Sequence, residues 1–184
     1  LLALSGVGGI TVARRLYQWN ADRQPPANFR VLVPAGFVSE VYALAEGADI
    51  PTVLTFGPDG ALYVMDASAH IYRFADADQD GVVDASTRIY DNPDSAISHS
   101  VGLTFDDAGT MYISYSGHIA TLTDGNGDGQ LDKLTVLVEG LPSLLFPDHS
   151  NNGIAFGPDG KLYIGVGAAT DHGPLNPDHP LEAS

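Results

Sequence analysis

Cysteine is absent from the chain. This absence excludes thiol nucleophiles, iron–sulfur clusters, cysteine zinc sites and disulfides, so any bound metal must use oxygen or imidazole ligands. Lysine and arginine are also scarce, because 8 of them stand against 23 aspartates and glutamates, which gives the 184 residues a formal net charge of −15. A charge of this sign excludes nucleic acid as a partner.

Glutamate is scarce as well: the 23 acidic residues are 19 aspartates and 4 glutamates. Helix interiors tolerate glutamate better than aspartate, whereas turns and calcium loops prefer aspartate. No stretch shows a sustained 3.6-residue hydrophobic period. Since 44% of the residues are hydrophobic, the chain can still form a core. We therefore predict a loop-rich, all-β protein.

Long apolar runs are missing too. The N-terminal run Leu1–Ala13 is shorter than the roughly 20 residues that a membrane-spanning helix needs. We interpret it as the remaining part of a signal sequence or membrane anchor, with a short buried helix or strand as the alternative. Residues 20–28 contain two prolines and fit an extended linker. We expect an N-terminal segment at 1–28, a folded domain at 29–184, and an exported protein, periplasmic or extracellular.

A pattern of about fifty residues occurs three times. The segments are LTFGPDGALYV, LTFDDAGTMYI and IAFGPDGKLYI, in which Phe56, Phe105 and Phe156 recur at intervals of 49 and 51 residues. Each segment fits a β-hairpin whose turn glycine supplies a special backbone conformation, the glycines being Gly60, Gly109 and Gly160. Units of this length with about four short strands are typical of β-propeller blades. The sequence predicts about three four-stranded blades.

Three blades cannot close a propeller ring, which needs at least four. The prediction is therefore an N-terminal fragment of a longer protein, or a chain whose exposed blade edges are covered by another chain.

Two aspartate-rich loops share the pattern D-x-[DN]-x-D-G-x-x-D. Side chains at positions 1, 3, 5 and 9 of such a loop can converge on one cation, because the glycine at position 6 allows a sharp turn. The apolar residues at position 8, Val83 and Leu131, are expected to anchor the loops in the core. Oxygen ligands favour Ca²⁺ with a structural role, and plain acidic turns are the alternative. The candidate ligands are Asp76, Asp78, Asp80, Asp84, Asp124, Asn126, Asp128 and Asp132.

One histidine stands in the loop that leads into the third repeat. His149 lies seven residues before Phe156, and His99 occupies nearly the same place one unit earlier. Loops that enter the inner strands of a propeller line its central pocket. The neighbouring Asp148 and Asp171 favour a catalytic over a merely solvated His149.

The segment GLPSLLFPDHSNNGIAFGPDGKLYIGVGAATDHG, residues 140–173, resembles the blade that carries the catalytic histidine in the glucose/sorbosone dehydrogenase family, the soluble sugar dehydrogenases that use pyrroloquinoline quinone (PQQ). The segment PAGFVSEVYALAEGADIPTVLTFGPDGALYV is similar to the opening of the same family. The resemblance implies a six-bladed propeller with the quinone bound over its centre.

The resemblance also implies roles for single residues. His149 is the general base that takes a proton from a sugar hydroxyl, Asp171 orients or stabilises its imidazolium, and Asp148 is the third candidate catalytic residue. His99 and Asn152 are candidate cofactor contacts. The implied function is the oxidation of an aldose or related polyol with PQQ, with Ca²⁺ in the aspartate loops and an unassigned electron acceptor.

Two alternatives remain from the sequence. The first is a non-catalytic, calcium-stabilised propeller that binds a carbohydrate or a protein partner. The second is an acidic, calcium-dependent adhesion module without redox activity.

Overall fold

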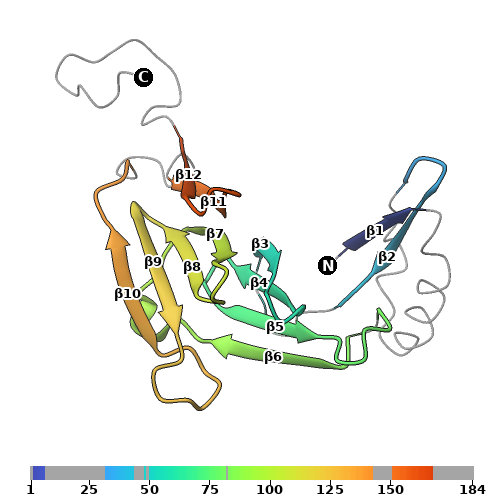
Figure 1. Ribbon diagram of the computed structural model, residues 1–184, viewed down its shortest axis with the longest axis horizontal. Helices are drawn as coiled ribbons and strands as arrows, with labels where there is room; N and C mark the ends of the chain where they lie inside the picture. The colour runs from blue at the N-terminus through green and yellow to red at the C-terminus, as the bar shows by residue number, and fades with distance from the viewer. Residues whose placement is uncertain are drawn as a thin grey trace, which may run out of the picture. The chain divides into compact units, whose positions relative to one another are not determined.

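The computed structural model describes residues 2–6, 32–43, 48, 50–81, 83–142 and 151–167. Within these ranges the regular structure is β-strand, apart from one 3-10 turn at Pro93–Ser95 (Figure 1). None of the described residues belongs to a helix with the length and apolar character needed to cross a membrane. The all-β prediction is confirmed.

The chain divides into two compact units. The first contains residues 1–47 and 74–86, and the second contains residues 48–73 and 87–184. In the first unit β1 (Leu2–Gly6) pairs antiparallel with β2 (Phe37–Val41). Residues 7–31 lie outside the described part, so the boundary expected at residue 28 stays a prediction.

Two four-stranded antiparallel sheets follow. Their strand orders are β3-β4-β5-β6 and β7-β8-β9-β10, and a two-stranded sheet β11-β12 comes last. Each sheet therefore follows chain order, as in a propeller blade. The bounds are β3 Pro51–Phe56, β4 Leu62–Asp66, β5 Ile71–Ala75, β6 Ala85–Tyr90, β7 Ser100–Phe105, β8 Met111–Tyr115, β9 His118–Thr123, β10 Lys133–Val138, β11 Asn151–Phe156 and β12 Leu162–Val166.

The first two strands of each sheet form the three predicted hairpins. In all three turns the glycine has a left-handed backbone, with φ of 76° at Gly60, 84° at Gly109 and 74° at Gly160. The N–H of each of these glycines donates to the carbonyl three residues earlier at 3.0 Å. Residues with a Cβ adopt this conformation at a cost, so the repeated glycine follows from the turn geometry.

A tyrosine on the second strand of each hairpin bonds to an aspartate of the turn. Tyr63 donates its hydroxyl hydrogen to Asp59 at 3.0 Å, and Tyr163 donates to Asp159 at 3.3 Å. In the middle hairpin the partner of Tyr112 is Asp106, at 3.3 Å. The turn of the second repeat, DDAG instead of GPDG, thus keeps the same contact with an aspartate from a different position.

Consecutive sheets pack through their first two strands. Strand β7 contacts both β3 and β11, so the first strands of the three sheets are neighbours. The ring of Tyr63 meets Phe105 edge-on with centroids 4.8 Å apart, and Tyr112 meets Phe156 in the same way at 5.0 Å. The first and second blades therefore each contribute a tyrosine that packs on the phenylalanine of the next.

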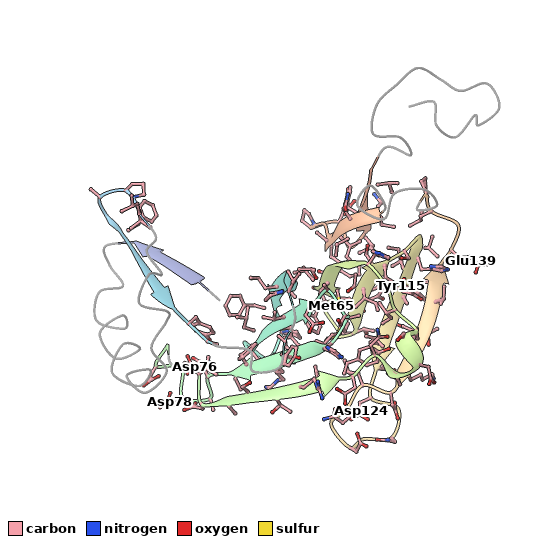
Figure 2. All side chains as sticks on the ribbon, turned by 180° about the vertical axis from the view of Figure 1, so that it is seen from behind. Met65, Asp76, Asp78, Tyr115, Asp124 and Glu139 are labelled. Atoms are coloured by element: carbon pink, nitrogen blue, oxygen red, sulfur yellow. The ribbon has the colours of Figure 1, made fainter. Side chains whose placement is uncertain are left out.

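The core of the second unit lies between the two four-stranded sheets. Its members come from both sheets and include Met65 and Tyr115, which are labelled in Figure 2. Met65, Ile71 and Ile113 are completely buried. Because burying such side chains contributes about 1.5–3 kcal/mol each, this core is the main source of stability between the blades.

Candidate functional site

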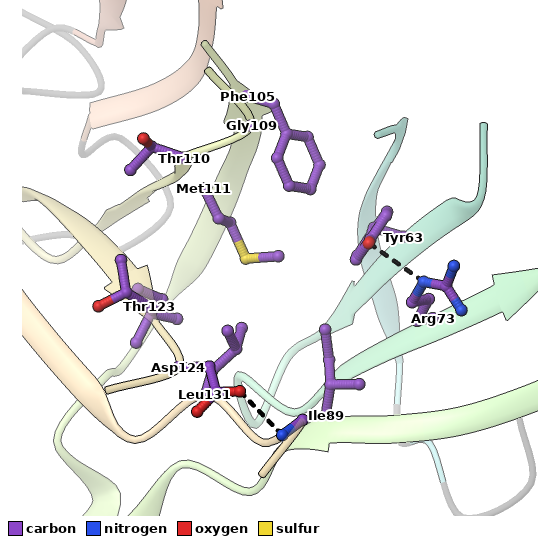
Figure 3. Close-up of a pocket in the computed structure, with 12 residues that line it drawn as sticks. Tyr63, Arg73, Ile89, Phe105, Gly109, Thr110, Met111, Thr123, Asp124 and Leu131 are labelled. Atoms are coloured by element: carbon purple, nitrogen blue, oxygen red, sulfur yellow. Dashed lines mark hydrogen bonds between the residues drawn. The ribbon is translucent and has the colours of Figure 1, made fainter. Parts of the chain in front are cut away.

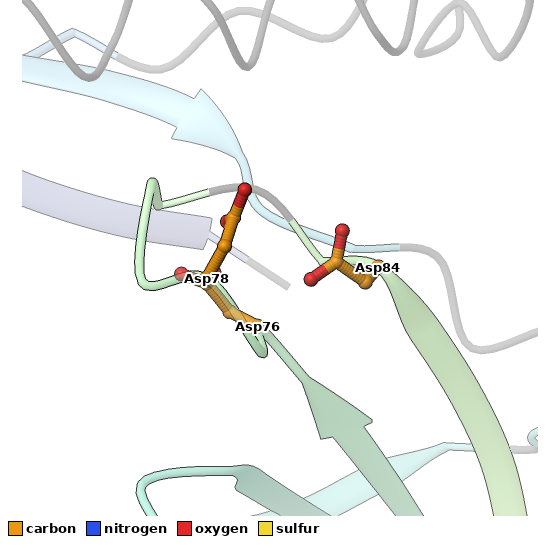
Figure 4. Close-up of side chains that lie close together, drawn as sticks. All are labelled: Asp76, Asp78 and Asp84. Carbon is orange, nitrogen blue, oxygen red and sulfur yellow. The ribbon is translucent and has the colours of Figure 1, made fainter.

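Three carboxylates of the first aspartate loop lie together in the first unit. Asp76, Asp78 and Asp84 each offer an oxygen, and these oxygens lie within 4.8 Å of one another (Figure 4). Asp78 and Asp84 are exposed and Asp76 is half-buried, so the cluster is open to solvent. The structure brings together three of the four ligands predicted in this loop, and Asp80 is not part of the cluster.

Backbone hydrogen bonds shape the first loop. Asp76 accepts the N–H of Asp80 at 3.1 Å and that of Gly81 at 2.8 Å. At the end of the loop Asp84 accepts the N–H of Ala77 at 2.8 Å. The first and last carboxylates of the motif thus fold the loop back on itself.

The second loop, in the second unit, repeats this pattern. Asp124 accepts the N–H of Gly127 at 2.6 Å and that of Gly129 at 2.8 Å, while Asp132 accepts the N–H of Gly125 at 2.7 Å. The N–H of Gly129 is the first of several backbone donors that lower the pKa of Asp124. This carboxyl is therefore held in its charged form.

Both loops also share a backbone conformation. Positions 4 and 6 are left-handed in each, with φ of 58° at Gln79 and 85° at Gly81, and 81° at Gly127 and 88° at Gly129. Position 8 anchors each loop as predicted. Val83 is buried, and Leu131 packs against the core.

The remaining predicted ligands of the second loop bond to one another and to the backbone. Asn126 accepts the N–H of Asp128 at 2.9 Å and donates its amide hydrogen to the Asp128 carboxylate at 3.1 Å. Asp128 also accepts the N–H of Gln130 at 2.8 Å. Carboxylate and amide oxygens in such a turn fit a hard dication such as Ca²⁺, and the Asp76, Asp78 and Asp84 cluster fits it best.

His99, one of the two histidines predicted at a strand entrance, lies at the end of the sheet β7–β10 that is opposite to the second aspartate loop. His99 precedes β7 in a left-handed conformation with φ 51°, and its Nδ1 lies 3.3 Å from Oγ of Ser116. Ser116 also donates to the carbonyl of Ser98 at 2.9 Å. The sequence analysis did not identify these two serines, because single serines carry no motif.

Asn152, the second predicted cofactor contact, lies in β11 and is exposed. Its backbone carbonyl accepts the hydroxyl hydrogen of Ser114 at 2.8 Å. A Cβ at Gly102 would lie 2.8 Å from this same carbonyl oxygen, so only glycine fits where β7 approaches β11. The backbone of Asn152 thus joins two blades, while its side chain is available at the surface.

Two other histidines at strand starts have structural partners. Nδ1 of His70 lies 3.0 Å from a carboxylate oxygen of Asp66, whose side chain is completely buried. His118 stacks on Tyr115 with ring centroids 5.1 Å apart. Asp66 was not a candidate in the sequence analysis, since nothing in a strand sequence marks an acid as buried.

The predicted catalytic residues His149, Asp148 and Asp171 lie outside the described residues. Their roles stay predictions. The structure describes the strand that follows: β11 begins at Asn151, two residues after His149 in the sequence. Likewise β7 begins one residue after His99. Both histidines therefore precede the first strand of a blade.

A pocket of about 290 Å³ lies in the second unit, where strands of the two four-stranded sheets meet the second aspartate loop (Figure 3). Apolar side chains such as Phe105, Met111 and Leu122 line much of it. Its one guanidinium, that of Arg73, already bonds to Asp59 at 2.7 and 2.9 Å. The sequence analysis did not predict this pocket.

The fold matches solved structures of enzymes. The AA12-family carbohydrate-active enzyme of Trichoderma reesei matches in an iodide and a calcium structure, at 22% and 20% identity. Both have a TM-score of 0.52 and cover 70% of this chain and 32% of that chain. A luciferin-regenerating enzyme matches at 15% identity and TM-score 0.51, covering 70% of this chain and 41% of that chain. These likenesses confirm the β-propeller fold.

The chain spans well under half the length of these proteins. No curated protein sequence matches it. The domain of unknown function DUF7133 matches residues 67–179, which is more than half of the chain.

Proposed function

The chain belongs to the family of the domain of unknown function DUF7133, and from this premise we propose that it is part of a calcium-stabilised β-propeller oxidoreductase that oxidises an aldose or related polyol with a quinone cofactor. The observation that carries the proposal is the place of His149, two residues before β11, within a segment that resembles the catalytic blade of PQQ sugar dehydrogenases. The carbohydrate-active enzyme of Trichoderma reesei, which has a similar fold, is consistent with it.

His149 is the proposed general base. A neutral imidazole accepts a proton from a hydroxyl near pH 7, which suits the first requirement of alcohol oxidation. Asp148 and Asp171 are the proposed carboxylates that orient the ring and stabilise its charged form. A bound quinone supplies the acceptor for the two electrons that leave the substrate carbon.

The described residues at this end of the blades fit part of a cofactor site. His99 and Asn152, together with Ser116, offer hydrogen-bonding groups at the starts of β7 and β11 and at the turn after β8. None of these three is a lysine or an arginine. The carboxylates of a quinone such as PQQ would therefore need basic residues from outside this group.

Calcium has a structural role in this proposal. The aspartate loops connect β5 to β6 and β9 to β10. A dication there neutralises clustered carboxylates. We propose export to the periplasm or the extracellular space, where calcium is abundant, with the N-terminal segment as signal or anchor.

The calcium proposal is tested by thermal unfolding with Ca²⁺ and with chelator. Calcium at 100 times its Kd would stabilise the protein by about 2.7 kcal/mol for each loop that binds it. The double variant Asp76→Asn and Asp124→Asn should lose this response. Asp107→Asn, at an exposed turn outside both loops, should keep it. An equal response in all three proteins would contradict binding in the loops.

The catalytic proposal is tested in the full polypeptide that carries this chain. With PQQ and Ca²⁺ added, it should reduce an artificial electron acceptor in the presence of an aldose, and omission of PQQ should abolish the reaction. Sugar binding without turnover would instead favour the non-catalytic propeller.

A further inference from the structure

The sequence contains two Asn-Gly pairs, and the structure places them in different surroundings. Asn126 and Gly127 are exposed in the second aspartate loop, between β9 and β10. Asn152 and Gly153 belong to strand β11, which pairs with β12. An asparagine side chain before glycine is open to attack by the next backbone nitrogen, because glycine has no Cβ to hinder the approach. The two pairs allow the effect of the surroundings to be separated from that of the sequence.

The backbone nitrogen of Gly127 lies beside a proton acceptor. Its N–H donates to the carboxylate of Asp124 at 2.6 Å. Gly127 is left-handed, with φ of 81°, a conformation that residues with a Cβ adopt at a cost. The conformation of the loop therefore favours the one residue type that leaves this nitrogen unhindered.

The side-chain amide of Asn126 is bonded at both of its polar atoms. Its Oδ1 accepts the N–H of Asp128 at 2.9 Å, and its Nδ2 donates to the Asp128 carboxylate at 3.1 Å. A donor on the carbonyl oxygen stabilises the negative charge that develops there when the carbon is attacked. A carboxylate beside the amide nitrogen stabilises the positive charge that this nitrogen gains as it leaves.

We propose that Asn126 is a site of self-catalysed deamidation, in which the backbone nitrogen of Gly127 attacks Cγ of Asn126. The Gly127 N–H gives its proton to the Asp124 carboxylate as the N–Cγ bond forms. The Cγ–Nδ2 bond then breaks, and the amide nitrogen takes up that proton and leaves as ammonia. Water opens the resulting succinimide ring to aspartate or isoaspartate. The reaction is intramolecular and needs no oxidant or reductant.

Asn152 has the same following residue in a different arrangement. Its backbone carbonyl accepts the hydroxyl hydrogen of Ser114 at 2.8 Å, a contact that joins two blades. Ring closure would require the backbone of Asn152 to leave the strand and would break this contact. Local opening of packed strands costs more free energy than motion in an exposed loop. We therefore expect Asn152 to stay intact while Asn126 reacts.

The products of the reaction change the second loop. An aspartate at position 126 gives this loop the D-x-D-x-D-G sequence of the first loop, in which Asp78 stands at the same place. The number of charged ligands tunes the calcium affinity of such loops. Isoaspartate instead adds a main-chain carbon and displaces the ligands that follow. This consequence for calcium rests on the proposed function, whereas the deamidation itself does not.

The experiment is incubation of the full polypeptide that carries this chain, at neutral pH with a calcium chelator, both folded and in urea. Tryptic peptides are then analysed by mass spectrometry. Trypsin separates the two sites, because Lys133 lies between them and Lys161 lies after the second. In urea Asn126 and Asn152 should deamidate at similar rates. In the folded protein we expect Asn126 to react at least as fast as in urea, and Asn152 at least about tenfold more slowly.

A pair of variants tests the role of the carboxylate. Asp124→Ser keeps an oxygen that can accept the Gly127 N–H but cannot hold its proton, so deamidation of folded Asn126 should slow by a factor of about 10², the lower end of a general base's usual contribution. Asp107→Ser, at an exposed turn outside both aspartate loops, is the matched control and should react as the parent protein.

Two results would overturn the inference. The first is slower deamidation of Asn126 in the folded parent protein than in urea, because the hydrogen bonds of the loop would then protect the amide. The second is a rate in Asp124→Ser that equals or exceeds that of the parent protein, because Asp124 would then take no part in the reaction. The chelator keeps both comparisons independent of calcium binding.

Discussion

The hairpins at residues 56–63 and 156–163 are almost the same peptide in two surroundings. They differ in sequence only at Ala61 and Lys161, and their turns have the same hydrogen bonds and the same left-handed glycine. Yet Tyr63 is 9% exposed and Tyr163 is 57% exposed. Local sequence determines the hairpin, whereas the neighbouring blade determines what the hairpin buries.

The largest expected effect comes from removing the ring of Tyr63, with the removal of the Tyr163 ring as its comparison. Tyr63→Ala should lower the free energy of unfolding by about 3–5 kcal/mol, because it empties a packed site between blades. Tyr163→Ala should change it by no more than about 0.5 kcal/mol, as expected for an exposed position. Urea unfolding of the two variants and the parent chain checks both. Equal losses would refute the difference in burial.

Substitutions at Gly57 and Gly157 should also differ in their effect on stability, with the larger loss in the first hairpin. A Cβ at Gly57 or Gly157 would meet the tyrosine ring of its own hairpin. Tyr63 is confined by Phe105, so Gly57→Ala should cost about 1–3 kcal/mol as an overpacked site. Tyr163 can turn into solvent, so Gly157→Ala should cost less than about 1 kcal/mol. The unfolding midpoints of the two variants provide the comparison.

The aromatic pair itself can be measured with a double-mutant cycle. Tyr63→Leu and Phe105→Leu should show a coupling of about 0.5–1.5 kcal/mol, the range found for edge-on aromatic pairs. Tyr163→Leu and Phe56→Leu should be additive, since these two rings lie in different blades and do not pair among the described residues. Additivity in the first cycle would mean that the rings contribute only by burial.

The smallest expected effect depends on pH. Partial burial opposes ionisation of Asp59, but hydrogen bonds from Arg73, the N–H of Ala61 and Tyr63 outweigh it, so folding lowers the pKa of this carboxyl. The contribution of Asp59 to the free energy of unfolding is therefore complete above the ordinary carboxyl pKa of about 3.9. It is lost as the pH falls through the lower folded pKa. Because solvent screens this half-exposed pair, the contribution should stay below about 1 kcal/mol.

This pH dependence is checked by urea unfolding of the parent chain and Asp59→Asn between neutral and acidic pH. The stability difference between the two proteins should be constant above roughly pH 5 and shrink below roughly pH 4. A difference that grows on acidification would show that the carboxyl is stabilised in its neutral form.

Repeats and turns could be predicted from the sequence because their causes are local. The glycines Gly60, Gly109 and Gly160 recur where a left-handed backbone is needed, and the aspartate loops follow a fixed spacing. The strands that these turns join follow from alternating apolar residues. Only neighbouring residues are needed for such a prediction.

Features that depend on contacts between distant residues could not be predicted. Ser116 meets His99 across 17 residues of sequence, and the hydroxyl of Ser100 donates to the backbone carbonyl of Asp66 across 34 residues. The glycine at 102 follows from the approach of β11, 50 residues later. No local pattern marks such residues, because another strand brings their partners to them.

The proposed function depends above all on His149 as the base of a quinone-dependent sugar oxidation. The most direct measurement is the steady-state rate of aldose oxidation by the full polypeptide, loaded with PQQ and Ca²⁺, for the parent protein, His149→Ala and His118→Ala. We expect His149→Ala to lower the rate by a factor of about 10²–10⁴, the usual contribution of a general base, and His118→Ala to retain the rate of the parent protein. An undiminished rate in His149→Ala would contradict the claim.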